Sequence, residues 1–391
     1  MSDTPRPLPP LWFLALITLT GTLAMHIFVP TLPMVARHFG ASGAAAQMTL
    51  SAYVIGLAAA QIAYGPVSDR YGRRPVLVVG LLIYTVAGLV ALTSVSMEML
   101  IVMRFFEALG GGAGLVLGRA IIRDGSAGPE AARRLSLMNL MVMAGPGLSP
   151  MLGAFIAEFA GWRAIFLALG CLGLLNLWLV TRYLPASSPS SGQSGWAILH
   201  GYLRMLRSPR FLGLVVGGSF ASTSMYAFVS AAPFIYIEQL GRPTQEVGVY
   251  LAINFLGTWF GSLATSRLAG RMETRLLMVG SNLVTWAGAL VFLGVVLTGS
   301  LSVPAVVIPM MMVSFGAGIA SPMALAEAMA VNPAMAGSSS GLYGCAQMAI
   351  GALCAALAGV GGNPAMAAAV VLAGAGLISQ IAFLVVGKAK G

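Results

Sequence analysis

Charged residues are scarce in this chain. Asp, Glu, Lys and Arg make up 8% of its 391 residues, whereas hydrophobic residues make up 58%. Soluble domains carry about 25% charged residues, so this chain lacks the polar surface that contact with water requires. The 21 Lys and Arg residues outnumber the 11 Asp and Glu residues, but they are scattered among short loops. We therefore expect a lipid bilayer, and no nucleic acid, as the partner of the chain.

Cysteine is also rare, and familiar catalytic motifs are missing. The three cysteines, Cys171, Cys345 and Cys354, fall within apolar stretches, and no Cys-x-x-Cys pair occurs. Such usage predicts neither a disulfide framework nor a metal site. No Gly-x-x-x-x-Gly-Lys-Ser/Thr motif is present, which argues against ATP hydrolysis. A membrane-embedded enzyme or sensor would show clustered metal ligands or a nucleophile paired with a base. Neither is visible, so we expect no enzyme activity, no metal and no cofactor.

Apolar runs of roughly 20 residues recur along the chain, each long enough to cross a hydrocarbon core of ~30 Å as a helix. The short alternating segments of a membrane β-barrel do not occur. The first apolar run is too long for a signal peptide core, so we expect it to be retained. Gly, Pro and charge clusters delimit twelve predicted transmembrane helices, at 11–35, 44–64, 75–95, 98–122, 133–157, 163–184, 209–236, 244–266, 275–297, 302–326, 337–359 and 364–386. The predicted fold class is an all-α membrane protein.

A polar segment rich in Ser, Pro and Gly divides these helices into two sets of six. It predicts an N-terminal six-helix bundle over 1–184, a cytoplasmic linker over 185–208 and a C-terminal six-helix bundle over 209–391. Paired helical halves with a substrate between them are typical of secondary transporters. No polar segment of comparable size occurs elsewhere, so we expect one two-part transporter domain.

The distribution of Lys and Arg predicts the orientation of the chain. Arg37, Arg163 and Arg242 fall at one set of helix ends, and Arg104 lies inside a span. Arg119 lies either inside a span or at the opposite ends, where the remaining basic residues lie. Short cytoplasmic loops carry an excess of Lys and Arg. Both termini are therefore expected in the cytoplasm.

One charged turn resembles a known signature. The stretch Gly65-Pro-Val-Ser-Asp69-Arg70-Tyr-Gly-Arg73-Arg74-Pro75 is similar to the loop between helices 2 and 3 of the major facilitator superfamily. The resemblance implies a conformational latch on the cytoplasmic side. In it, Asp69 would approach the N-terminal end of the eleventh helix, near 336–340, or Arg123. A less complete copy of this motif, Ser266-Arg-Leu-Ala-Gly-Arg271, follows the eighth span.

Further motifs resemble one group within that superfamily, the drug:proton antiporters of bicyclomycin and chloramphenicol resistance. Arg104-Phe-Phe-Glu107-Ala-Leu-Gly in span 4 is similar to the Arg-x-x-Gln-Gly pattern of the group. Span 5 carries Gly145-Pro146-Gly-Leu-Ser149-Pro150-Met-Leu-Gly153-Ala154, which is like the antiporter motif with Ser149 and Ala154 in place of glycine. The resemblance implies a bacterial inner-membrane exporter.

Span 1 departs from the pattern of the group. In Ala24-Met-His26-Ile-Phe-Val-Pro30, His26 stands where the group has an aspartate, and Glu107 stands where it has glutamine. The resemblance implies that this aspartate takes part in proton and drug coupling. The acid has therefore moved from span 1 to span 4, and we expect His26, Arg104 and Glu107 to form the proton-coupling set.

Each of these residues also has a structural interpretation. An unpaired arginine inside a membrane costs at least ~2.5–3.5 kcal/mol, so Arg104 is expected to face the central cavity with Glu107, one turn away, as its partner. That pair either exchanges protons or is only structural. The unperturbed pKa of histidine, about 6.5, suits a proton switch, but His26 could equally be a neutral side chain bonded to a neighbouring helix.

Met and aromatic side chains repack around ligands of different shapes, and several lie where a central cavity is expected. Each one alone is more often core than ligand contact, and Glu327 is either a second buried acid or an interfacial one. The candidate substrate contacts are Tyr53, Met138, Asn139, Met143, Tyr226, Phe228, Asn254, Trp259, Tyr343 and Gln347.

The sequence thus predicts a monomeric, proton-coupled exporter of lipophilic or amphiphilic drug-like molecules. Two alternatives share the fold: an exporter of an endogenous metabolite, and a proton-coupled uptake symporter.

Overall fold

The computed structural model describes residues 9–126, 128–185, 203–331 and 336–388. Some side chains inside helices, among them those of Arg123, Asn139 and Met143, lie outside the described part as well. Within the described residues every regular element is a helix, apart from an isolated β-bridge between Ala269 and Met272. The predicted all-α class is confirmed.

The helices of the N-terminal half correspond to the first six predicted spans. The first span is divided into three pieces, because Pro30 and Pro33 interrupt the backbone donors of the helix. The elements are α1 (Leu11–Ile27), η1 (Val29–Thr31), α2 (Leu32–Phe39), α3 (Gly43–Tyr71), α4 (Arg73–Leu92), α5 (Met97–Gly125), α6 (Gly128–Ala160) and α7 (Arg163–Tyr183).

The C-terminal half repeats this arrangement, and its first span is interrupted too. A turn at Ser224 separates α9 from α10, and a π-helical segment, η2, follows Pro233. The elements are α9 (Pro209–Thr223), α10 (Met225–Phe234), η2 (Ile235–Gln239), α11 (Thr244–Leu268), α12 (Thr274–Leu297), α13 (Val303–Ala330), α14 (Ala336–Leu357) and α15 (Pro364–Lys388). The predicted linker lies mostly outside the described residues.

The length and hydropathy of these helices suit a bilayer. Eleven helical segments of the described chain are long and apolar enough to span a membrane. The remaining predicted span, 133–157, falls within α6, which is 33 residues long but is not among the eleven. Large apolar side chains also cover the outer surface; Phe159 is 73% exposed and Trp178 is 61% exposed. In water such exposure would be costly, so this surface is the one that faces lipid.

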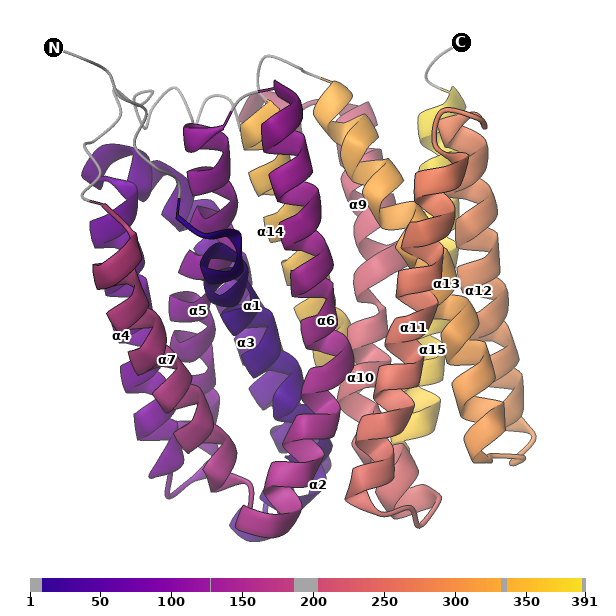
Figure 1. Cartoon of the computed structure of the whole chain (residues 1–391). Coiled ribbons are helices and arrows are strands. Elements are labelled where there is room, and N and C mark those ends of the chain that lie inside the picture. Colours follow the sequence, from indigo (N-terminus) through magenta and orange to yellow (C-terminus); the bar gives the residue numbers. More distant parts are fainter. Residues whose placement is uncertain (1–8, 127, 186–202, 332–335, 389–391) are drawn as a thin grey trace, which may run out of the picture.

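Figure 1 shows the helices standing roughly side by side, with the N-terminal half on the left and the C-terminal half on the right. We call the end at which α3 leads into α4 the arginine-rich end, at the top of Figure 1. The other end, where α2 leads into α3, is the arginine-poor end. The halves meet chiefly through two helix pairs, α3 with α14 and α6 with α11, and more lightly where α10 and α11 touch η1 and where α10 touches α2 and α3.

Helix α5 lies at the centre of the N-terminal half and packs on α1, α3 and α4. Glycines make this approach possible. A Cβ added at Gly110 would lie 2.8 Å from the Cα of Tyr84, and one at Gly114 would overlap with the carbonyl oxygen of Ile17. Small residues at this spacing let helix backbones approach closely in membranes. The close packing brings Arg104 and Glu107 of α5 against α1, α3 and α7.

The buried apolar residues show how the halves are joined. One cluster at the arginine-poor end includes side chains of both halves, from Phe28 and Leu50 to Phe228 and Leu372. At the arginine-rich end the clusters are separate. One, around Leu117, belongs to the N-terminal half, and the other, around Leu214, belongs to the C-terminal half. The two halves thus share an apolar core at one end only.

Candidate functional site

Arg104 and Glu107 form an ion pair inside the N-terminal half. Arg104 Nη1 lies 2.7 Å from Glu107 Oε2, and the two side chains are 1% and 0% exposed. Arg104 Nη2 also donates to the carbonyl oxygen of Ala24 on α1, at 3.0 Å. The expected pairing one helical turn apart is therefore what the structure shows. Glu107 Oε1 and Arg104 Nε have no hydrogen-bond partner within the described residues.

Aromatic rings surround the guanidinium group. The centre of the Tyr53 ring lies 4.0 Å from Arg104 Cζ, and the rings of Phe28 and Phe166 lie at 5.2 and 6.0 Å. The Tyr53 hydroxyl donates to the carbonyl oxygen of Gly21, at 2.7 Å. Cation–π contacts are strongest where water is excluded. Arg104 is thus enclosed by α1, α3, α7 and Phe28, which follows α1, and it does not face a central cavity, contrary to expectation. The reason is the close packing of α5 described above.

His26 occupies a different position, between the halves. Its Nδ1 lies 2.8 Å from the carbonyl oxygen of Thr22, and its side chain is 3% exposed. Two rings of the C-terminal half face it: Phe255 of α11, with centroids 5.0 Å apart, and Tyr226 of α10, at 6.5 Å. His26 Nε2 is buried without a partner in the described part of the chain. Phe255 was not predicted; it precedes the predicted Trp259 by one helical turn, a spacing visible in the sequence.

Helix α1 links the two positions. Ala24, which accepts from Arg104, lies two residues before His26 on the same helix. The Arg104–Glu107 pair and His26 are thus connected through the backbone of α1. The three predicted proton-coupling residues are brought near one another, with Arg104 and Glu107 inside one half and His26 at the boundary.

The predicted latch forms an ion network at the arginine-rich end. Arg73 Nη1 lies 2.7 Å from Asp69 Oδ1, and Arg73 Nε lies 2.9 Å from Asp124 Oδ2. Arg74 donates to the Thr181 carbonyl oxygen at 3.4 Å. Asp124 was not among the predicted latch residues, although it follows the basic end of span 4 in the sequence.

The structure describes only some of the remaining residues of the predicted latch. Arg70 stacks over the ring of its neighbour Tyr71, 5.4 Å from the centroid. The side chains of Arg123 and of residues 336–338 lie outside the described part. The predicted approach of Asp69 to Arg123 or to the start of α14 therefore stays a prediction.

The antiporter motif of α6 packs against α1 and α11. A Cβ at Gly145 would overlap with Leu19, and one at Gly153 would overlap with the carbonyl oxygen of Ile27. Pro146 and Pro150 lie within the continuous helix α6. The carbonyl oxygen of Pro150 would lie 2.8 Å from a Cβ at Gly248 of α11. Ser149 and Ala154, which replace glycine, are both buried.

The predicted substrate contacts separate into groups. Tyr226, Trp259 and Gln347 are partly or well exposed, and Gln347 Nε2 donates to the hydroxyls of Ser222 and Ser321 at 2.8 and 3.1 Å. Asn254 is fully buried on α11, and neither its amide nitrogen nor its amide oxygen has a partner within the described residues. The side chains of Asn139 and Met143 lie outside the description.

Four other candidates lie inside a half rather than along a cavity. These are Tyr53, Met138, Phe228 and Tyr343, each at most 1% exposed. Their surroundings explain this placement: Met138 Sδ lies 3.6 Å from the hydroxyl of Thr18, Phe228 packs edge-on against Phe292, and Tyr343 contacts the carbonyl oxygen of Ser321 at 3.4 Å. They take part in the helix packing around the site, and their role as substrate contacts stays a prediction.

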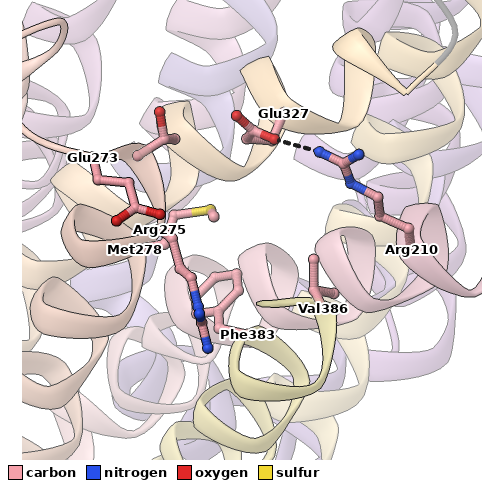
Figure 2. A pocket seen from close by; sticks show the side chains of 8 residues that line it. Arg210, Glu273, Arg275, Met278, Glu327, Phe383 and Val386 are labelled. Carbon is pink, nitrogen blue, oxygen red and sulfur yellow. Dashed lines mark hydrogen bonds and ion pairs between the residues drawn. The ribbon is translucent and has the colours of Figure 1, made fainter. Parts of the chain in front are cut away.

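Glu327 lies at the arginine-rich end of the C-terminal half. Figure 2 shows it paired with Arg210 at one edge of a pocket of about 180 Å³, with Arg210 Nη2 and Glu327 Oε2 3.0 Å apart. Glu273 and Arg275 line the other side of this pocket. The Glu327 side chain is 23% exposed. Glu327 is thus a partly buried, paired acid in the last turn of α13.

Comparisons with known proteins agree with this architecture. A family model described as Major Facilitator Superfamily matches residues 14–356. A "Bicyclomycin resistance protein homolog" of Haemophilus influenzae is 26% identical over 354 residues, which cover 88% of this chain and 87% of the relative. "Multidrug resistance protein D" of Escherichia coli is 28% identical over 344 residues, which cover 85% of this chain and 84% of the relative. Among solved structures, the nucleoside transporter NupG has a similar fold, with a TM-score of 0.78, 12% identity and coverage of 96% and 98%.

Proposed function

The chain belongs to the Major Facilitator Superfamily, and we propose that it exports drug-like molecules in exchange for protons. Its family and its relatives make it a multi-pass membrane transporter and not an enzyme. The resemblance seen in the sequence is thereby confirmed. Export, proton coupling and the substrate class are the parts that we propose.

The buried ion pair carries this proposal. Burying two charges is costly even when they are paired, and an ionisable residue inside a membrane marks a functional site by default. Glu107 is a carboxylate that can gain and lose a proton, whereas Arg104 keeps its charge. Protonation of Glu107 would turn a neutral pair into a site of net positive charge. The site thus has two states of different charge, which a proton gradient can bias.

The separate apolar clusters support alternating access. The halves share a core at the arginine-poor end, where the substrate path is closed, and have separate cores at the arginine-rich end. With the arginine-rich end in the cytoplasm, the structure faces inward. In this orientation both termini lie in the cytoplasm. The proposed transporter acts as a monomer in the bacterial inner membrane. A rocking motion of the halves about the site would expose it to the other side.

Drug export, rather than another use of the fold, is supported by the relatives whose printed names refer to bicyclomycin resistance and multidrug resistance. A proton-coupled uptake symporter is the alternative, because His26 stands where the resembled group has an acid. The direction of transport separates the two. An exporter accumulates substrate inside inverted vesicles with an acidic interior, whereas an uptake symporter empties them.

The decisive experiment compares Glu107→Gln with the wild type in inverted vesicles. Glutamine keeps the size and the hydrogen-bond acceptor of Glu107 but cannot exchange a proton. We expect gradient-driven accumulation of drug to be lost while the protein remains folded by gel filtration. Glu98→Gln is the matched control, because Glu98 is an exposed acid in the first turn of the same helix. Accumulation by Glu107→Gln that still depends on pH would remove Glu107 from the mechanism.

A further inference from the structure

Three buried side-chain atoms of the N-terminal half have no hydrogen-bond partner within the described residues, and they complement one another. Glu107 Oε1 of α5 and Asn176 Oδ1 of α7 are acceptors, whereas the hydroxyl of Tyr84 on α4 can donate. All three side chains are 0% exposed. The large majority of buried polar atoms in proteins are bonded to another protein group or to an ordered water molecule. These three atoms therefore need a partner that offers two donors and one acceptor.

The ring of Tyr84 reaches from α4 into the middle of this half. A Cβ added at Gly111 of α5 would lie 3.2 Å from Cδ2 of the ring, and one at Gly173 of α7 would lie 3.0 Å from Cδ1. Glycine at both positions thus leaves room for the ring between α5 and α7. The hydroxyl of Tyr84 is within electrostatic range of Glu107 and Arg104, although it bonds directly to neither.

Asn176 lies on the face of α7 that meets α1. Its Nδ2 atom donates to the hydroxyl of Thr20, at 2.7 Å, and Oδ1 remains as its second polar atom. Thr20 precedes Gly21, and a Cβ added at Gly21 would lie 2.9 Å from the carbonyl oxygen of Gly111. Helix α1 thus brings Asn176 beside the same turn of α5 that the Tyr84 ring contacts.

Gly88 of α4 leaves room beside the carboxylate oxygen. A Cβ added at Gly88 would lie 3.7 Å from Glu107 Oε1 and 3.9 Å from the amide nitrogen of Gly170, with nothing nearer. Gly88 is one helical turn from Tyr84, so both residues lie on the same side of α4. Glu107 Oε1 therefore borders a space that a small group can enter, next to the turn that carries Tyr84.

We propose that a buried water molecule binds between α4, α5 and α7 and passes the transported proton to Glu107. The water accepts from the Tyr84 hydroxyl and donates to Glu107 Oε1 and Asn176 Oδ1. Buried waters typically make about three hydrogen bonds to polar groups that have no other partner, and this one satisfies all three atoms. Tyr84 and Asn176 are positioning residues, because they hold the water and do not take up the proton themselves.

The inference rests on the proposed function and deepens it. It places the proton site inside the N-terminal half, apart from the boundary between the halves. A proton that reaches the water makes it a hydronium ion, which gives one proton to the ionised carboxylate and becomes water again. One O–H bond breaks at the ion and one forms at Glu107 Oε1, so no other reactant is needed. Release of the proton is the same step in reverse.

Few other charged or titratable groups lie near Glu107. They are Arg104 on the same helix, His26 on α1, Tyr53 on α3 and Tyr84 on α4. The Tyr53 hydroxyl already donates to the backbone of α1, and Arg104 Nε has no partner within the described residues and can also donate to the water. The described Arg residues of α4 and α7 lie in first or last turns, and Cys171 of α7 is exposed. Tyr84 is therefore the donor that can be removed without changing a charge.

Infrared difference spectroscopy of the purified full-length protein tests the water directly. Between acid and alkaline pH, the wild type should show the carbonyl stretch of a protonated carboxyl group that Glu107→Gln lacks. It should also show a water O–H stretch that shifts in isotopically labelled water. Tyr84→Phe keeps the ring but loses the hydroxyl, so we expect the water band to disappear. The titration midpoint of the Glu107 band should then shift by about one pH unit or more, the size expected for a hydrogen bond to a charged group.

A second variant and a matched control isolate the site. Gly88→Ala puts a methyl group beside Glu107 Oε1 without overlap, so it should displace the water and shift the midpoint as well. Tyr236→Phe is the control, because the Tyr236 hydroxyl is equally buried and without a partner among the described residues, but it belongs to η2 of the other half. It should leave both bands as they are in the wild type. Circular dichroism checks that each variant is folded.

The outcomes separate this inference from the proposed function. A Glu107 band that titrates in the wild type, with a midpoint and a water band that neither Tyr84→Phe nor Gly88→Ala changes, would overturn the water site and leave proton exchange at Glu107 intact. If no titrating carboxyl band of the wild type is lost in Glu107→Gln, the proposed function itself is overturned.

Discussion

The Arg104–Glu107 pair yields a sharp prediction about stability. Replacing Glu107 with leucine keeps most of the side-chain volume but leaves the Arg104 guanidinium buried without its counter-ion. Arg104 cannot escape by losing its proton. Breaking a buried pair in this way costs about 3–5 kcal/mol, and because the two side chains are 1% and 0% exposed, water does not screen the effect.

The two single substitutions are not equivalent. Replacing Arg104 with methionine leaves Glu107, whose carboxyl group can take up a proton and become neutral, as buried unpaired acids do. We therefore expect Arg104→Met to destabilise the protein less than Glu107→Leu. The double variant removes both charges together, and exchanging a buried pair for apolar side chains of similar volume is often neutral or stabilising. The double variant should be more stable than Glu107→Leu by several kcal/mol, on the order of the cost of the broken pair.

Reversible unfolding by SDS in detergent micelles, followed by circular dichroism, measures these differences. The wild type, both single variants and the double variant form a thermodynamic cycle that isolates the coupling between the two residues. Glu98→Leu, an exposed acid on the same helix, is the control and should unfold like the wild type. Additive effects of the two single substitutions, to within about 0.5 kcal/mol, would show that the pair does not interact and would refute the reasoning.

Three further predictions concern packing, the latch and orientation. Gly153→Leu should lower expression and the unfolding midpoint, because its side chain would overlap with the backbone of α1, whereas Gly147→Leu, with nothing within 4 Å of its Cβ, should be tolerated. Asp69→Asn should cost about 1 kcal/mol or a little more in SDS unfolding, because the Asp69–Arg73 pair is only partly buried, at 35% and 19% exposed, and pairs that reach water contribute little. It should nevertheless change the rate of drug transport; a large loss of stability with an unchanged rate would contradict a latch. In a variant without native cysteines, Thr298→Cys should react with a membrane-impermeant maleimide in intact cells and Arg271→Cys should not; the reverse pattern would invert the proposed orientation.

Much of the site could be predicted from sequence where one helix contains both partners. Arg104 and Glu107 are three residues apart, so they meet on one face of any helix. The break of the first span at Pro30 is equally local, because proline lacks a backbone donor wherever it stands. Such features depend on covalent structure and helix geometry alone.

Which side of each helix packs against protein and which side meets lipid could not be predicted in the same way. Amphipathic periodicity identifies the buried side of a helix only when the other side meets water. Here both lipid and protein interior are apolar, so Tyr53, Met138 and Phe228 carried no signal that they lie inside a half. The contact of His26 with Phe255 joins residues far apart in the chain, and Asp124 reaches Arg73 through the fold.

The sequence by itself determined that this chain is a helical membrane protein of two halves, that a charge pair lies inside one span, and that a histidine replaces an expected acid. The first two follow from composition and from spacing along single helices, and the third follows from the resemblance of span 1 to the drug:proton antiporters. Only the tertiary structure decided that the ion pair is sealed among aromatic rings, that the Nε2 atom of His26 lies without a donor between the halves, and that the halves share a core at one end. Those facts depend on which helix faces meet, and close glycine contacts between distant segments determine that.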